Sequence, residues 1–265
     1  MRHAVTVDGD DKTLDVRAMD ADCIIHWKLE QAPTKPADME QPQPGESAHA
    51  VRQFFVKQVE KNGSCMILAW EGDVVVGQMH FTTREIHKTL GGPENYEAGS
   101  CYCVDHEGFG PKLSEFNDEG IEHLLESESR VLRILCFNVG HTDPRWHGKG
   151  IAKAMVEYLK QWAREREWRR IEARSCPDII PTSIVGDWML RRGTYERLGF
   201  HVKQEHKVTP EESENRLWEI ERLSAPNPDY PPWVKYYVTQ LPRLLIDPDW
   251  KTEYDKNYLM ACDLQ

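Results

Sequence analysis

The segment most suited to chemistry is Arg145-Trp146-His147-Gly148-Lys149-Gly150-Ile151-Ala152. Glycines let the backbone approach a ligand closely, and a helix that starts here would face the ligand with free N–H groups and the positive end of its dipole. Arg145 and Lys149 add positive charge beside these N–H groups. Glycines, helix start and basic side chains together indicate a site for a phosphate group.

Two common phosphate-binding motifs do not fit this loop. A Walker loop needs Ser or Thr directly after Gly-Lys and a glycine five residues before Gly148, where this chain has Gly150 and Asp143. The dinucleotide fingerprint needs Gly or Ala three residues after Gly150, and Lys153 stands there. The loop therefore belongs to neither class.

Regular elements are predicted on both sides of the loop. Residues 131–139, VLRILCFNV, are almost wholly apolar, which predicts a strand buried on both faces. From Ile151 to about Glu167 the apolar residues recur on one stripe, which predicts an amphipathic helix. Further upstream, residues 66–70 and 74–81 predict an antiparallel hairpin around Glu71-Gly72-Asp73, and residues 51–63 predict a helix that ends at Gly63.

The spacing Arg-x-x-Gly-x-Gly-x-Ala after such a strand resembles the pyrophosphate-binding motif of the GCN5-related N-acetyltransferase (GNAT) superfamily. Residues 194–200, TYERLGF, resemble the carboxy-terminal YE-x-x-GF signature of that superfamily. A strand at 170–175 and a helix at 188–198 are predicted between the loop and the end of this signature. With the hairpin as the family's second and third strands, the resemblance covers roughly residues 13–208.

The resemblance implies an α/β (α+β) fold with a mixed, mostly antiparallel seven-stranded sheet flanked by helices. Its fourth and fifth strands would splay apart to admit the pantetheine arm of acetyl-coenzyme A. Residues 1–208 would form the core, with residues 84–130 as an insert. Residues 209–265 would be a C-terminal extension that completes the sheet of the same domain, with a strand predicted at 234–241.

The resemblance also assigns roles to individual residues. The groups that would hold acetyl-coenzyme A are those of Phe137, Asn138, Val139, Arg145, His147, Gly148, Lys149, Gly150, Ile151 and Ala152. Tyr195 stands where the family's tyrosine commonly protonates the departing thiolate. The family's base does not carry over, because its strand positions hold Arg133, Ile134 and Leu135. His80, Glu85, His141 and Glu172 have suitable chemistry, and none is singled out.

The function that the resemblance implies is transfer of an acetyl group from acetyl-coenzyme A to a primary amine of a small molecule, by direct attack in a ternary complex. Two alternatives stay open. One is a non-catalytic sensor or regulatory module that binds acyl-coenzyme A, and the other is an acetyltransferase that modifies protein amino termini or lysines. The length of the acyl group is not fixed by the motifs.

Charge narrows the choice of partner. Thirty-three basic and 44 acidic residues give a net charge of −11, which disfavours nucleic acid as a partner. The insert at 84–130 holds 11 acidic and 4 basic residues. It is either a solvated surface segment or an acidic rim that attracts a cationic amine.

The cysteine content and the length of the apolar runs bear on cofactors and cellular location. Seven scattered cysteines favour reduced thiols, and only Cys101 and Cys103 are closely spaced, so we expect no metal site. Apolar runs are far shorter than the roughly 18 residues of a membrane span, and no apolar secretory segment follows Met1. We therefore expect a cytoplasmic protein without a membrane partner. The aromatic carboxy-terminal residues could pack in the core, over the substrate cleft or in a homodimer interface.

Overall fold

The computed structural model describes residues 1–20, 46–89, 118–126, 128–140, 143–178, 189–210, 213–214, 216, 218 and 253–264. The chain forms two compact units, which are described separately. The first comprises Met1–Glu94, Ser100–Ile171 and Asp263–Gln265, and the second comprises Asn95–Gly99 and Glu172–Cys262.

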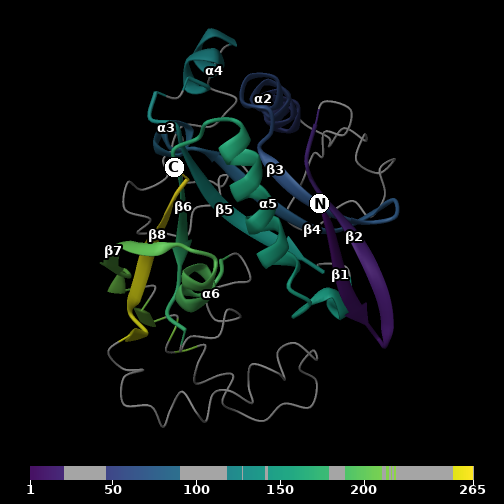
Figure 1. Ribbon diagram of the computed structural model, residues 1–265. Coiled ribbons are helices and arrows are strands. Elements are labelled where there is room, and N and C mark those ends of the chain that lie inside the picture. Colours follow the sequence, from purple (N-terminus) through teal and green to yellow (C-terminus); the bar gives the residue numbers. More distant parts are fainter. Residues whose placement is uncertain are drawn as a thin grey trace. The chain divides into compact units, whose positions relative to one another are not determined.

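Five antiparallel strands, side by side in chain order, form the sheet of the first unit (Figure 1). They are β1 (Arg2–Val7), β2 (Asp10–Ala18), β3 (Met66–Glu71), β4 (Val74–Thr83) and β5 (Val131–Val139). The predicted hairpin is confirmed as β3 and β4, with Gly72 at φ 57° in the turn between them. The predicted buried strand is confirmed as β5.

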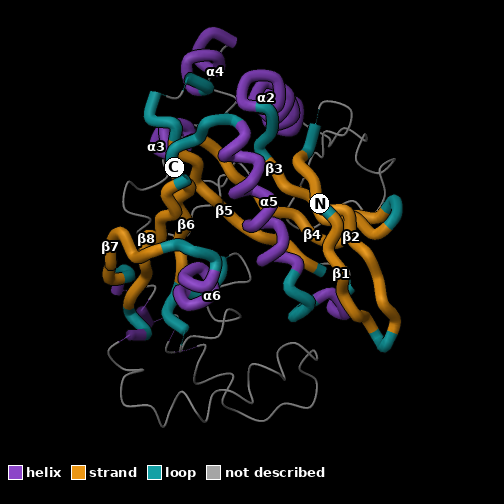
Figure 2. The backbone as a smooth tube through the Cα atoms, in the orientation of Figure 1, coloured by secondary structure: helices purple, strands orange, loops and turns teal. Residues whose placement is uncertain are grey.

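Helices cover both faces of this sheet. Neighbouring residues of a strand point to opposite sides of the sheet, so the contacts of successive β4 residues show which helix lies on which face. On one face lies α5 (Ile151–Glu165), whose Trp162 packs edge-on against Phe81 with 5.2 Å between ring centroids. On the other lies α2 (Glu46–Asn62), whose Phe55 packs against His80 and whose Gln58 accepts a hydrogen bond from Thr82. Figures 1 and 2 show α5 crossing the strands.

Three short elements complete the described part of the first unit. They are α3 (Arg84–Thr89), α4 (Asp118–Leu124) and the 3₁₀ helix η2 (Pro144–Trp146). None of the described helices combines the length and the apolar composition that a bilayer crossing requires.

The second unit is built on β6 (Arg170–Ser175, from Glu172 onward), β8 (Lys256–Asp263) and β7 (His201–Lys207), in this spatial order. Strands β7 and β8 are antiparallel, from His201 opposite Ala261 to Lys207 opposite Lys256. The short helix α6 (Arg192–Arg197) precedes β7. The predicted fold class is thereby confirmed, but eight strands are described where seven were expected: β1 and β8 were not predicted, and the predicted strand at 234–241 lies outside the described residues.

The helix predicted from residue 188 begins later than expected. Met189 and Leu190 are not helical, and Arg191 is extended and bridges to Cys176, so α6 starts at Arg192. The Asp178 carboxylate accepts a 2.9 Å hydrogen bond from the Gly193 N–H. The helix start is thus fixed by a carboxylate fifteen residues upstream, which local capping rules do not anticipate.

Several predicted segments lie outside the described residues. These are the helix at 20–29, the strand at 234–241, and residues 90–117 of the acidic insert. The structure does place a strand, β8, in the aromatic tail, for which no strand was predicted. The boundary at residue 208 stays a prediction.

Candidate functional site

The loop between β5 and α5 joins a buried strand to a helix that packs on the sheet of the first unit. Its path is fixed by backbone hydrogen bonds, from the Gly140 N–H to the Val76 carbonyl (3.0 Å) and from the Asp143 N–H to the Gly140 carbonyl (3.1 Å). At its far end Ile151 is buried, and a Cβ built on Gly77 would lie only 2.8 Å from its Cγ2 atom. The glycine in β4 therefore allows the start of α5 to rest directly on the sheet.

The two glycines of the loop adopt backbone conformations that other residues avoid. Gly148 has φ 71° and Gly150, the N-cap of α5, has φ 76°. No side chain caps the helix start, and no heavy atom of the described residues lies within 4 Å of a Cβ built on Gly148. The first N–H groups of α5 are therefore left for another acceptor. This geometry suits a phosphate group.

Arg145 already has two carboxylate partners in this structure. Its Nη2 donates to Asp143 Oδ2 at 2.6 Å and its Nη1 donates to Asp8 Oδ2 at 3.1 Å. The hydrogen bond from Arg145 lowers the pKa of Asp143 below its ordinary value. Asp8 belongs to the turn between β1 and β2, so the N-terminal hairpin brings a negative charge to the predicted anion site.

The other loop residues lie beside the same N-terminal hairpin. His147 and Lys149 are half-buried, and Ala152 is half-buried in the first turn of α5. The His3 ring Nε2 lies 3.4 Å from the Lys149 carbonyl oxygen. The structure thus brings together the predicted residues from Arg145 to Ala152, with His3 and Asp8 as neighbours that the motif did not indicate.

The predicted pantetheine residues lie at the end of β5. Phe137 is buried, whereas Asn138 and Val139 are half-buried. They lie opposite Met79, Gln78 and Gly77 of β4, in that order. All ten residues predicted to hold acetyl-coenzyme A therefore belong to the first unit.

Tyr195, the predicted acid, belongs to the second unit. It lies in α6, is fully buried, and packs against Phe200 with 5.0 Å between ring centroids. Its carbonyl accepts the Phe200 N–H at 3.0 Å. The TYERLGF motif thus forms a compact helix end, with Gly199 at φ 83° completing the turn. The acid role of Tyr195 stays a prediction.

Two of the four candidate bases have surroundings that make them poorly suited to accept a proton. His80 is buried, and burial lowers its pKa to about 3, far from the near-neutral value that suits a general base. Glu172 is completely buried and paired with Lys203. Glu85 is half-buried in the first turn of α3, and His141 lies outside the described residues. No base is assigned from these four.

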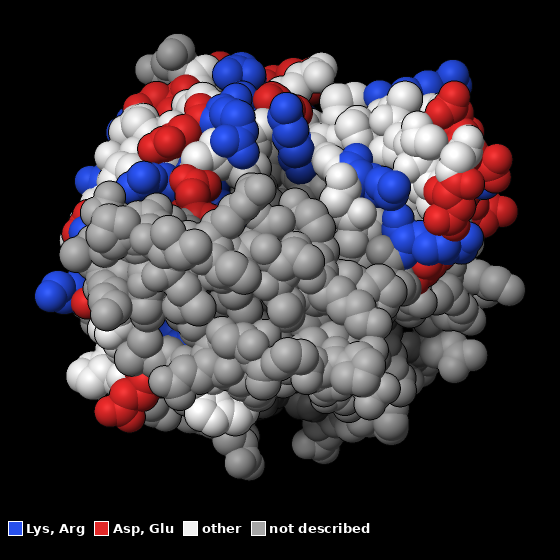
Figure 3. Space-filling model, turned by 90° about the horizontal axis from the view of Figure 1, so that it is seen from below, with Lys and Arg blue, Asp and Glu red and all other residues white. Residues whose placement is uncertain are grey.

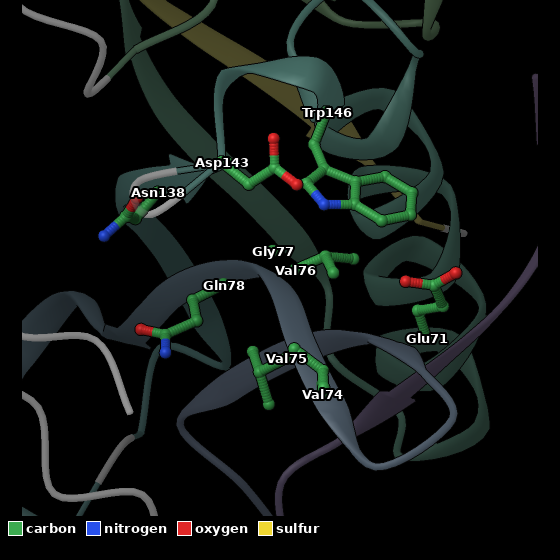
Figure 4. Close-up of a pocket in the computed structure, with 10 residues that line it drawn as sticks. Glu71, Val74, Val75, Val76, Gly77, Gln78, Asn138, Asp143 and Trp146 are labelled. Carbon is green, nitrogen blue, oxygen red and sulfur yellow. The ribbon is translucent and has the colours of Figure 1, made fainter. Parts of the chain in front are cut away.

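A pocket of about 180 Å³ opens next to the loop (Figure 4). It is lined by Glu71, Val74, Val75, Val76, Gly77, Gln78, Asn138, Gly140, Asp143 and Trp146. Figure 4 shows the Gln78 and Asn138 side chains extending on one side of the strands. The lining residues Gln78 and Trp146 were not predicted as site residues. The available signal was an amide within the otherwise apolar run VVVGQMHF.

Charges on the described surface are mixed. Figure 3 shows lysine and arginine side chains interspersed with aspartate and glutamate on the face it presents. No group of three His, Cys, Asp or Glu side chains with metal-binding geometry occurs within the described ranges, and Cys101 and Cys103 lie outside them.

Comparison with known proteins gives one family match. Residues 133–181, which include most of β5, the loop, α5 and β6, match the model of the acetyltransferase (GNAT) family. The predicted resemblance to this superfamily is confirmed, and the subfamily is unresolved. No curated protein matches the chain.

Remote similarities to solved structures accompany this match. A putative arylalkylamine N-acetyltransferase 7 from the mosquito Aedes aegypti is 11% identical, with a TM-score of 0.46 over 100% of this chain and 94% of that one. Arylalkylamine N-acetyltransferase 2 from Aedes aegypti is 13% identical, with a TM-score of 0.41 and coverages of 95% and 99%. The ribosomal-protein-S18-alanine N-acetyltransferase from Escherichia coli is 9% identical, with a TM-score of 0.38 and coverages of 95% and 94%.

Proposed function

Because residues 133–181 match the model of the acetyltransferase (GNAT) family, we propose that the protein transfers an acetyl group from acetyl-coenzyme A to a primary amine of a small molecule. Direct attack of the amine within a ternary complex is the proposed route. The pyrophosphate of the coenzyme would be bound by the N–H groups at the start of α5 and by Lys149, with Arg145 beside them. The left-handed glycines Gly148 and Gly150, at a helix start whose N–H groups no described side chain caps, carry this proposal.

The acceptor amine must lose a proton before it can attack. An amine with a pKa of about 10.4 is neutral only about once in 2,500 molecules at pH 7, a deficit of roughly 4.6 kcal/mol. His80, with a pKa of about 3, and the ion-paired Glu172 are poorly suited to accept this proton. The proposal therefore includes no general base from the described residues.

Tyr195 is the proposed acid. A phenol with a pKa of about 10 can give a proton to a departing thiolate, and a positioned acid contributes roughly 10²- to 10⁴-fold to a rate. We expect Tyr195→Phe to lower kcat by a factor in this range while the affinity for coenzyme A stays the same. Phe retains the ring that packs against Phe200, so the variant should unfold at nearly the wild-type temperature. An unchanged kcat would remove Tyr195 from the mechanism.

The coenzyme site itself is tested by thermal unfolding with acetyl-coenzyme A, with ADP and without ligand. A ligand at 100 times its Kd adds about 2.7 kcal/mol of stability, which raises Tm by several degrees in a chain of this size. We expect a larger rise with acetyl-coenzyme A than with ADP. No rise with either ligand at saturating concentration would exclude the loop as a coenzyme site.

A sensor that binds acetyl-coenzyme A without turnover is the second candidate, favoured by the weak bases His80 and Glu172. Thiol release in the presence of varied amines separates the two functions. An enzyme consumes acetyl-coenzyme A with at least one amine, and a sensor binds it and consumes none. Peptides with free amino termini belong in the same screen, because they test the protein-modifying alternative.

A further inference from the structure

Gln78 is a buried amide without a hydrogen-bond partner in the part of the chain that the structure describes. Its side chain is 2% exposed, and neither its Nε2 nor its Oε1 atom has a partner among the residues that the structure describes. An unsatisfied buried polar group is destabilising, and native structures satisfy the great majority of such groups. Gln78 is therefore retained at a cost to the free energy of folding unless a ligand completes its hydrogen bonds.

The same row of β4 shows how this fold satisfies a buried amide elsewhere. Gln78, His80 and Thr82 point to the same face, because side chains alternate along a strand. At the Thr82 end of the row, Gln58 of α2 is also 2% exposed, and its Oε1 accepts the Thr82 hydroxyl hydrogen bond at 3.0 Å. At the other end of the row, Gln78 lines the pocket shown in Figure 4.

The neighbours of Gln78 define the chemistry of the pocket. Asn138 lies directly opposite it on β5 and supplies a second, half-buried amide on the same side of the strands (Figure 4). Val74, Val75 and Val76, with the buried Trp146, supply apolar surface. A ligand that fits here has an apolar body and a head group that both donates and accepts hydrogen bonds.

The two carboxylates that line the pocket do not favour a cationic ligand, because each is already paired with a basic side chain. Glu71 pairs with Lys12 at 2.9 Å, and Asp143 pairs with Arg145 at 2.6 Å. A cation would have to compete with these partners, and an anion would meet two carboxylates. An uncharged head group meets neither obstacle.

We propose that this pocket binds a small uncharged carboxamide, whose oxygen accepts from Gln78 Nε2 while its N–H donates to Gln78 Oε1. Asn138 binds the outer edge of the same head group, and the valines and Trp146 contact its apolar body. The site lies in the first unit and shares Asn138 with the predicted coenzyme site, but its test uses neither a coenzyme nor acyl transfer, so its failure and the failure of the proposed function are distinguishable.

The experiment measures binding of three ligands that share one ring, benzamide, benzylamine and benzoate, by calorimetry at neutral pH without any acyl donor. We expect benzamide to bind at least about tenfold more tightly than the benzylamine cation or the benzoate anion. Equal affinities for the three ligands, or no binding of benzamide, would overturn the proposal.

Two glutamine variants link this binding to Gln78. Gln78→Leu should lower benzamide affinity at least about tenfold and raise Tm, since it removes an unsatisfied amide. The matched control Gln58→Leu removes an equally buried but bonded amide, so it should lower Tm and leave benzamide affinity unchanged. Gln78→Glu keeps the side-chain shape and should shift the preference from benzamide to benzylamine. A Gln78→Leu protein that binds benzamide like the wild type contradicts the proposal, and so does a Gln78→Glu protein with unaltered preference.

Discussion

Burial controls the protonation of individual histidines in the first unit. His80 faces Phe55 of α2, and burial lowers its pKa from 6.5 to about 3. His87 is shifted in the same direction: burial and the nearby Arg133 guanidinium lower its pKa to about 3. Both rings are therefore neutral at pH 7 and stay neutral well into the acid range. This makes them structural groups in the folded state.

The pKa of His80 predicts how stability depends on pH. In the unfolded chain His80 takes up a proton near pH 6.5, whereas in the folded protein it does so only near pH 3. The unfolded state therefore binds more protons between these values, so the free energy of unfolding is highest above pH 6.5. It falls by about 1 kcal/mol per pH unit for this residue as the pH decreases toward 3.

Urea denaturation from pH 6.5 to pH 5 checks this prediction. We expect His80→Gln to have a shallower dependence of unfolding free energy on pH than the wild type. His123→Gln is the matched control, because the side chain of His123 is 85% exposed. Identical slopes for the wild type and His80→Gln would show that this ring is protonated alike in both states.

At the scale of elements, two hairpins contact the segment formed by the β5–α5 loop and the start of α5. The strand pair β3 and β4 brings Gly77 against Ile151 and so supports the start of α5. The pair β1 and β2 brings Asp8 to Arg145 and His3 to the Lys149 carbonyl. The first contact positions the loop backbone, and the second changes the charge of the predicted pyrophosphate site.

The Asp8 contact predicts that the N-terminal hairpin weakens anion binding. Asp8→Asn removes a negative charge 3.1 Å from the Arg145 guanidinium. We expect it to tighten coenzyme A binding by about two- to fivefold at low salt, which is the scale of an exposed ion pair, and by less at high salt. Calorimetry at both salt concentrations measures the effect.

Asp10→Asn is the control for this prediction, since it removes the same charge from the same hairpin. Asp10 is exposed and pairs through its backbone with Val7, and no hydrogen bond or ion pair between it and Arg145 occurs in the structure as described. If Asp10→Asn tightens binding as much as Asp8→Asn does, the effect is one of net charge and the specific contact is unimportant.

At the scale of the whole molecule, buried thiols are found in both units. Cys65 and Cys136 lie in the first unit, and Cys176 and Cys262 lie in the second. All four are buried thiols that form no disulfide within the described residues, and burial raises the pKa of Cys136 to about 12 and that of Cys176 to about 11. Since the thiolate is the reactive form, folding should protect these residues from alkylation.

Alkylation with iodoacetamide followed by mass spectrometry tests this protection. At pH 7.5 a thiol with a pKa near 12 forms thiolate roughly three orders of magnitude less often than an ordinary cysteine with a pKa of about 8.5. We expect the four cysteines to stay unlabelled in the native protein and to react in urea. The division between the units falls inside β6, between Ile171 and Glu172, so we expect all four to become reactive at the same urea concentration. Separate midpoints for the two pairs would show that each unit unfolds independently.

The sequence alone determined the elements whose signals are local. The apolar run of β5, the hairpin of β3 and β4, the stripe of α5 and the stop of α2 at Gly63 were all predicted, because periodicity and glycine conformation depend on neighbouring residues. The glycine loop was predicted for the same reason. Its backbone chemistry is encoded in eight consecutive residues.

Only the tertiary structure decided what depends on distant partners. The start of α6 is set by Asp178, the charge near Arg145 by Asp8, and the pairing of β8 by β7. The unsatisfied state of Gln78 could not be read from the sequence either. A single glutamine in an apolar strand can be solvated, bonded or unpaired, and the physical difference lies in which side chains, far apart in the chain, fold against it.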